Sequence, residues 1–174
     1  DLFVPPYEPL VPRYLRVGVE ERTLYTGQVL ASLDEEEVKG AMEYLVREGV
    51  ESVAICFLHS YANPLNERRA LEICSDHYDK IHTVASHEVL PVWREYERFS
   101  TTVLSAYVGP IVQSYLRSLD QRLRDAGFKG ALFIVACSSL TQSVEYCLRR
   151  AVHVIGSGPA AAPTAAVYSG RQSG

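Results

Sequence analysis

A loop of small residues between a strand-like run and a helix-like run is the sharpest local signal for chemistry. It reads Gly156, Ser157, Gly158 and Pro159 and leads into Ala160. Glycines placed after a strand and before a helix let backbone N–H groups face an anion at the positive end of that helix. No Gly-Lys-Ser/Thr follows, and the third glycine of the dinucleotide fingerprint is missing. Two interpretations stay open: contact with a ligand, or close packing of the next helix against another helix.

Polar side chains also follow two apolar runs that read as strands. His59 comes directly after one run, and His87 and Glu88 follow another. Ligands collect at the carboxyl ends of strands in open α/β sheets, so these three residues are candidates for a cleft. They could be imagined as metal ligands, but no i, i+4 histidine pair and no His-Glu-x-x-His motif supports that, so we expect no metal site. The alternative is that they only satisfy neighbouring backbone groups.

A charged run, Arg-Glu-Tyr-Glu-Arg, extends from Arg94 to Arg98. Glu95 and Arg98 can pair across one helical turn, while Arg94 and Arg98 share a face. Two arginines on one face could instead grip a carboxylate or a phosphate. The run is therefore either a structural ion-pair cluster or part of a cleft, and Arg94 and Arg98 are its candidate site residues.

Four cysteines, at 56, 74, 137 and 147, are widely spaced and form no Cys-x-x-Cys pair. This spacing favours free, buried or half-buried thiols over a disulfide framework or a zinc ribbon. Cys137 stands just past a predicted strand end, as an exposed nucleophile would. No base lies near it in sequence, so nucleophilic catalysis is unsupported.

The elements that must position these residues alternate along the chain. The region 14–33 is predicted to hold two strands with a turn at Thr26-Gly27. Short apolar runs then predict strands at 52–58, 81–85, 131–136 and 152–155, and amphipathic periodicity predicts helices at 32–49, 65–77, 101–126, 141–149 and 160–168. Pro110 should kink the long helix. The fold class is α/β, with these strands in one mostly parallel sheet flanked by helices.

The amino-acid composition and the net charge limit the classes of protein to which the chain can belong. The chain has 174 residues, of which 47% are hydrophobic, and its formal net charge is 17 − 21 = −4. This mildly acidic balance disfavours nucleic acid or an anionic membrane as the partner. No apolar run approaches the roughly 18 residues of a spanning helix, and we expect a cytoplasmic protein.

Several motifs occur together in one order. They are Phe57-Leu-His-Ser-Tyr-x-Asn-Pro64, Ser86-x-Glu-Val-Leu-Pro91, Arg94-Glu-Tyr-Glu-Arg98, Thr101-Thr-Val-Leu-x-Ala-Tyr-Val-Gly-Pro110 and Ser157-Gly-Pro-Ala-Ala161. In this combination the chain resembles the hydantoinase A/5-oxoprolinase family, which includes acetone carboxylase β-type subunits. The resemblance extends from about Pro9 to Tyr168.

The resemblance implies a part of an actin-like (ribonuclease H-like) ATPase fold. It also implies a parent that uses ATP and Mg²⁺ to open a cyclic imide or lactam, with a B-type subunit or fused domain as partner and a homo-oligomeric state. An ATP-dependent carboxylase subunit of the same family is the alternative, and a non-catalytic scaffold is a third possibility. The segment from Gly158 to Tyr168 resembles the small-residue helix that connects the two halves of that fold.

The chain also departs from the family pattern. The two phosphate-binding hairpins are expected before Asp1 and after Gly174, so the chain is expected to be an internal fragment that binds no ATP alone. Ala136-Cys-Ser-Ser-Leu140 replaces a Gln-Ser-Asn-Gly-Gly turn, and Ala162-Pro163 replaces a glycine position. We expect a proline-rich lead-in over 1–14, an α/β region over 15–155, and the start of a following domain over 156–174.

Overall fold

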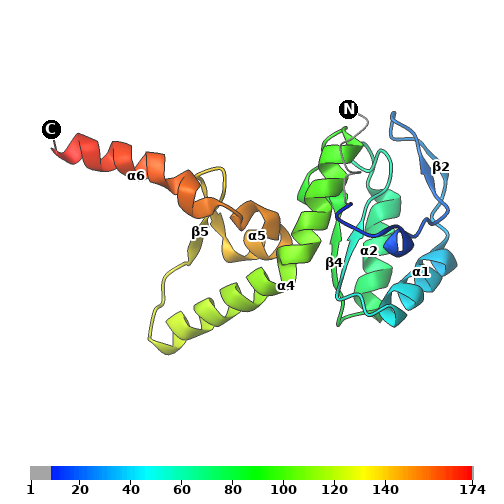
Figure 1. The fold of residues 1–174 in the computed structure, drawn as a ribbon, viewed down its shortest axis with the longest axis horizontal. Helices are drawn as coiled ribbons and strands as arrows, with labels where there is room; N and C mark the ends of the chain where they lie inside the picture. The colour runs from blue at the N-terminus through cyan, green and yellow to red at the C-terminus, as the bar shows by residue number, and fades with distance from the viewer. Residues whose placement is uncertain (1–8, 174) are drawn as a thin grey trace, which may run out of the picture.

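The computed structural model describes residues 9–173, so the first half of the proline-rich lead-in lies outside the described residues. The chain is a mixed α/β protein with two lobes that share one long helix, α4 (Figure 1). The elements, in chain order, are η1 (Arg13–Leu15), β1 (Arg22–Thr23), β2 (Val29–Ala31), α1 (Glu35–Arg47), β3 (Ser52–Ile55), α2 (Leu65–His77), β4 (His82–Ala85), α3 (Ser86–Val89), α4 (Glu95–Asp125), β5 (Phe133–Val135), β6 (Thr141–Ser143), α5 (Val144–Arg149), η2 (Ala151–Val154) and α6 (Ser157–Ser173).

The N-terminal lobe is built on a strand–helix–strand unit. β3 and β4 pair in parallel, with Ser52 opposite His82 and Ile55 opposite Ala85, and α2 makes the crossover. Alternate side chains of a strand point to opposite faces. Ile55 and Val53 accordingly join the core under α1 and α2, whereas Ala54 joins the core beside α4. The predicted α/β alternation is confirmed for this part of the chain.

Local signals explain where these elements begin and end. The Asp34 side chain accepts hydrogen bonds from the Glu36 and Glu37 amides and so caps α1. Past the end of α1, Gly49 has φ of +80°, a conformation that favours glycine. The predicted turn at Thr26-Gly27 joins β1 to β2 in an antiparallel hairpin. The strand predicted from Leu15 is wrong, because a 3₁₀ turn over 13–15 is followed by extended chain that pairs with no strand.

The prediction of one mostly parallel sheet is wrong. The described strands form three separate two-stranded sheets. β5 pairs with β6 in an antiparallel hairpin, and residues 141–143 belong to that hairpin, not to the predicted helix. The run predicted as a strand at 152–155 is mostly the 3₁₀ helix η2, which packs on α4. A four-residue apolar run indicates burial but does not distinguish a strand from a short helix.

The long helix α4 buries the opposite face from the one that its large apolar residues predict. Thr102, Ser105, Ala106 and Gly109 face the lobe, whereas other positions carry large exposed side chains, namely Leu104, Tyr107, Ile111 and Tyr115. Small residues occupy the inner face of α4 because this helix lies close against β3 and β4. A Cβ on Gly109 would overlap with the His82 ring, whose Nε2 is the nearest atom.

The sequence predicted one further feature of α4 correctly, the kink at Pro110, and another incorrectly, the start of the helix. The helix begins at Glu95, so the charged run is its first turn and not a separate segment before it. Pro110 lies inside the helix, and Figure 1 shows α4 changing direction near its middle, as the predicted kink requires.

The C-terminal helix α6 projects away from the rest of the molecule (Figure 1). It begins at Ser157 directly after Gly156, whose φ is +70°. Pro159 therefore lies in the first helical turn, where a missing N–H costs nothing. The predicted tight loop is shorter than expected, and the predicted helix is longer at both ends.

Candidate functional site

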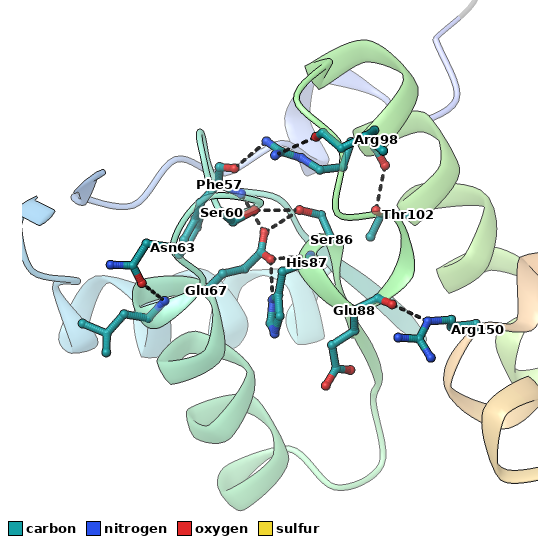
Figure 2. A network of polar contacts seen from close by, with 12 residues as sticks. Phe57, Ser60, Asn63, Glu67, Ser86, His87, Glu88, Arg98, Thr102 and Arg150 are labelled. Atoms are coloured by element: carbon teal, nitrogen blue, oxygen red, sulfur yellow. Dashed lines mark hydrogen bonds and ion pairs between the residues drawn. The ribbon is translucent and has the colours of Figure 1, made fainter. Parts of the chain in front are cut away.

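A buried network of polar side chains joins the carboxyl ends of β3 and β4 (Figure 2). Its centre is Glu67 in the first turns of α2, whose side chain is 0% exposed. One carboxylate oxygen accepts hydrogen bonds from the Phe57 amide at 2.9 Å and the Ser86 hydroxyl at 2.7 Å. The other accepts from the His87 amide at 2.7 Å and lies 2.6 Å from His87 Nδ1. One carboxylate thus ties together the chain segments that follow two neighbouring strands.

Glu67 stays ionised at this site. Burial alone would raise its pKa, but the hydrogen bonds from the His87 ring, from the Phe57 and His87 amides and from Ser86 hold the pKa below its ordinary value. An ionised carboxylate only accepts hydrogen bonds. Nδ1 of His87 must therefore carry the proton that lies between the two side chains.

Arg98 enters the same network from the opposite side. Its guanidinium is fully buried and donates to the carbonyl of Phe57 at 2.8 Å and to that of Val92 at 3.3 Å. Glu67 and Arg98 thus bond to the amide and to the carbonyl of the same residue, Phe57, and a buried anion and a buried cation fix it between them (Figure 2). Nε of Arg98 is buried without a hydrogen-bond partner among the described residues.

The loop after β3 completes this site. His59 has φ of +57°, and its carbonyl accepts from the amides of Ala62 and Asn63. The His59 ring lies edge-on to Tyr61, and the Arg98 guanidinium stands 5.3 Å from the centre of the Tyr61 ring. The Ser60 hydroxyl is buried 3.1 Å from that of Ser86, so this loop is joined to the end of β4.

Of the predicted site residues, the structure brings His59, His87 and Arg98 into one network. Arg94 does not join them: its side chain is 62% exposed and pairs with Glu97 on the surface. Figure 2 shows the Glu88 carboxylate directed away from Glu67. Glu88 instead lines a separate hollow of about 280 Å³ beside α4, together with His82, Gln113, Arg117 and others.

The small-residue loop lies in the other lobe. Gly156, Gly158 and Pro159 are exposed, and Ser157 and Ala160 are half-buried. Ser139 donates a hydrogen bond to the Ala160 carbonyl at 2.5 Å, which attaches the start of α6 to the turn after β5. The structure thus separates this loop from the network around Glu67.

The cysteines offer no nucleophile within the network. Burial, followed by the neighbouring charge of Glu67, raises the pKa of the Cys56 thiol to about 12 despite a hydrogen bond to Thr102 and the charge of Arg98. All four cysteines are free, and Cys137 is exposed, so the expectation of burial is wrong for that residue. Within residues 9–173, no three His, Cys, Asp or Glu side chains cluster as metal ligands would.

Glu67 is the residue that the motif search missed, although the sequence carries a signal for it. Positions 67, 70 and 74 fall on one helical stripe, and Ala70 and Cys74 are core residues. A glutamate on an apolar stripe is a buried charge that needs partners. The same reasoning applies to Arg98, which shares the buried face of α4 with Thr102 and Ser105.

The chain is similar to proteins of one family over nearly its whole length. Residues 1–78 match the Hydantoinase/oxoprolinase N-terminal region, and residues 98–174 match Hydantoinase/oxoprolinase. It is 34% identical to caprolactamase subunit alpha of Pseudomonas jessenii over 95% of this chain and 24% of that protein.

Two solved structures agree with this. The ATP-dependent caprolactamase from Pseudomonas jessenii superposes with a TM-score of 0.86 at 33% identity, over 100% of this chain and 25% of that one. Acetone carboxylase, without nucleotide, superposes with a TM-score of 0.83 at 32% identity, over 95% and 24%. The chain spans about a quarter of the length of these relatives. It belongs to the hydantoinase/oxoprolinase family.

Proposed function

We propose that the parent protein opens a cyclic amide, a lactam or an imide, in a reaction driven by ATP, and that this chain is a structural quarter of that enzyme. The observation that carries the proposal is the superposition of the whole chain on an ATP-dependent caprolactamase with a TM-score of 0.86. At 33% identity, a match of this quality supports a shared fold and family, within which lactam opening is our proposal.

The fold that we propose for the parent is the actin-like ATPase fold. Support comes from the parallel strand–helix–strand unit of the N-terminal lobe and from the family resemblance. In this proposal α6 is the connecting helix, the region over 15–155 is one unit, and residues from 156 onwards open the next.

The described residues do not fit a complete ATP·Mg²⁺ site. They include no cluster of three metal-ligating side chains, and the exposed start of α6 lies in a different lobe from the buried charges of the network. We therefore assign the nucleotide and Mg²⁺ contacts to other parts of the parent, and no step of the reaction is assigned to them here.

A carboxylase of the same family is the second candidate. Acetone carboxylase superposes almost as well as caprolactamase, with TM-scores of 0.83 and 0.86. This fold is therefore shared by proteins that are named for two different chemistries. A scaffold without catalysis is the third candidate.

The partner that we propose is a B-type subunit or fused domain, because the related caprolactamase chain is named as a subunit alpha. A homo-oligomeric assembly and a cytoplasmic location complete the proposal. Among residues 9–173, no helix combines the length and the apolar character that crossing a membrane requires.

The test is coupled turnover by the full-length parent with its neighbouring B-type subunit. ADP release is measured with five-, six- and seven-membered lactams and with hydantoin, and the ring-opened amino acid is quantified in the same samples. Acetone with bicarbonate forms the carboxylase arm. If the amount of ring-opened product is proportional to the ADP released, the hydrolase proposal is supported. If ADP is released only when acetone and bicarbonate are present, the hydrolase proposal is wrong and the carboxylase takes its place. The isolated 174-residue chain should release no phosphate above a heat-denatured control.

A further inference from the structure

We infer that His87 and Glu67 form a proton-transfer site of the parent enzyme. In this site Nε2 of His87 exchanges a proton with the water or substrate N–H group that faces it, and Glu67 is the positioning residue. The inference rests on the proposed function and assigns one step of that reaction to side chains of this chain.

Hydrogen-bond donors occupy the Glu67 carboxylate completely. Two backbone amides, one hydroxyl and one imidazole nitrogen surround its two oxygens at 2.6–2.9 Å. With its side chain 0% exposed, Glu67 is held in a single position by the two segments that follow β3 and β4. A carboxylate so enclosed does not meet substrate, but it sets the orientation of whatever donates to it.

Nε2 is the remaining nitrogen of the His87 ring. Because Nδ1 donates to Glu67, the proton of the neutral ring is on Nδ1 and the lone pair is on Nε2. Among the described residues Nε2 has no hydrogen-bond partner, and it is not among the buried unpartnered atoms. The side chain retains 10% exposure, so Nε2 meets solvent while Nδ1 is held in the interior.

The neighbouring Ser86 and Cys56 side chains are unsuited to this proton transfer. The Ser86 hydroxyl is fully buried and donates to Glu67, so its proton is already engaged. The Cys56 thiol has its pKa raised to about 12 by burial. Among these three side chains, His87 is thus the group that combines a ring nitrogen without a hydrogen-bond partner, access to solvent and a buried counter-charge.

The proton balance of the step is simple. As water attacks the amide carbonyl, the C–O bond forms, the π electron pair of the carbonyl moves onto its oxygen, and the water O–H bond breaks as one proton moves to Nε2. The oxygen returns its electron pair to re-form the C=O bond as the C–N bond breaks. The imidazolium is balanced by the Glu67 carboxylate, which stays ionised throughout. When the C–N bond breaks, Nε2 returns that proton to the ring nitrogen as it becomes an amine.

The decisive variant is His87→Asn in the full-length parent, because an asparagine Nδ2 can replace Nδ1 as the donor to Glu67 but provides no titratable nitrogen. Its kcat should fall by about 100-fold or more, and the acidic limb of the kcat profile should disappear. The urea midpoint should stay at the wild-type value. His77→Asn, at an exposed histidine in the last turn of α2, is the matched control and should keep wild-type turnover.

A second measurement is independent of activity. The ¹⁵N shifts of the His87 ring in the labelled chain should show the Nδ1–H tautomer, and Glu67→Gln should abolish that preference. An Nε2–H tautomer in the wild type overturns the inference. If His87→Asn keeps both the turnover and the pH profile of the wild type, the inference is wrong, but the proposed function is unaffected. A wild-type parent without turnover overturns both.

Discussion

The two lobes of the molecule treat buried polarity differently. In the N-terminal lobe, Glu67 and Arg98 are almost completely inaccessible, and both bond to Phe57. In the C-terminal region after α4, the buried side chains are small and neutral, namely Ala136, Cys147 and Ala151. Large apolar residues there are exposed instead, among them Phe133, Leu140 and Tyr168.

This difference shows what a buried charge requires. The N-terminal lobe has two parallel strands whose chain turns away at one edge, and the free backbone groups at that edge supply partners for an anion and a cation. In the C-terminal lobe, the chain that leaves β5 bonds to neutral backbone groups instead, since the Cys137 amide donates to the His153 carbonyl at 2.7 Å. We infer that the first lobe is stable through its own contacts, whereas the second gains its core from other parts of the parent. The chain spans about a quarter of the related caprolactamase chain.

The largest effect is expected from removing the central carboxylate. Glu67→Ala leaves the buried Phe57 and His87 amides and the Ser86 hydroxyl without their acceptor, so the free energy of unfolding should fall by about 4–5 kcal/mol. Glu72→Ala, on the same helix with a side chain 52% exposed, should change it by less than about 0.5 kcal/mol. Urea unfolding of the two variants measures the difference, and equal midpoints would contradict the importance of the network.

The Glu67 contribution should also depend on pH in one direction. Because its pKa in the folded state is lower than the ordinary value of 4.5, its stabilising contribution is fully present above pH 4.5. It is lost as the pH falls through the folded-state pKa. The gap in unfolding free energy between wild type and Glu67→Ala should therefore narrow below pH 4.5, and a gap that widened there would reverse the assignment.

A somewhat smaller loss is expected from the cation. Arg98→Ala removes both hydrogen bonds to backbone carbonyls and leaves a cavity beside Tyr61, so we expect a loss of about 3 kcal/mol. Arg94→Ala, four residues earlier on the surface, should cost less than about 0.5 kcal/mol. Chemical denaturation compares them directly. If Arg98→Ala unfolds at the wild-type midpoint, Phe57 is not held in the way described.

The contact between α4 and β4 provides a prediction of intermediate size. Gly109→Ala would place a methyl group against the His82 ring and should destabilise the chain by about 1–3 kcal/mol. Gly40→Ala is the matched helical control, because a Cβ there meets nothing within 4 Å. It should raise the unfolding free energy by about 0.5–1 kcal/mol. Thermal unfolding would show shifts of opposite sign, and two shifts of the same sign would disprove the close approach.

The smallest effect is expected in the C-terminal helix. Tyr168 is 66% exposed on α6, so Tyr168→Ala should change the unfolding free energy of this chain by less than about 0.5 kcal/mol. Amide hydrogens of α6 should exchange much faster than those of β3 and β4, because few buried contacts hold that helix. Exchange followed by mass spectrometry tests this, and protection of α6 equal to that of the strands would remove the contrast between the lobes.

The sequence predicts the N-terminal lobe well because its signals are local. The Asp34 cap, the apolar stripe of α1 and the short runs of β3 and β4 each depend on residues within a few positions of one another. After α4 the same reasoning succeeds for β5, which lies within the predicted strand at 131–136, and for α6, which contains the predicted helix at 160–168. It fails for the segment between them. The run at 152–155 is apolar enough for a strand, but contact with α4 makes it mostly a 3₁₀ helix instead.

The residues of the candidate site also fall into two groups, those that local sequence signals identify and those that only the tertiary structure reveals. Residue types and spacing single out His59, His87 and Arg98, because each follows a predicted strand or precedes a predicted helix. They do not identify Glu67, although it lies 10 residues from Phe57 and 20 from His87. Periodicity describes one helix at a time, whereas the partners of a buried charge come from several segments. The docking of α2 against β3 and β4 decides which donors surround Glu67, and therefore which nitrogen of His87 stays free.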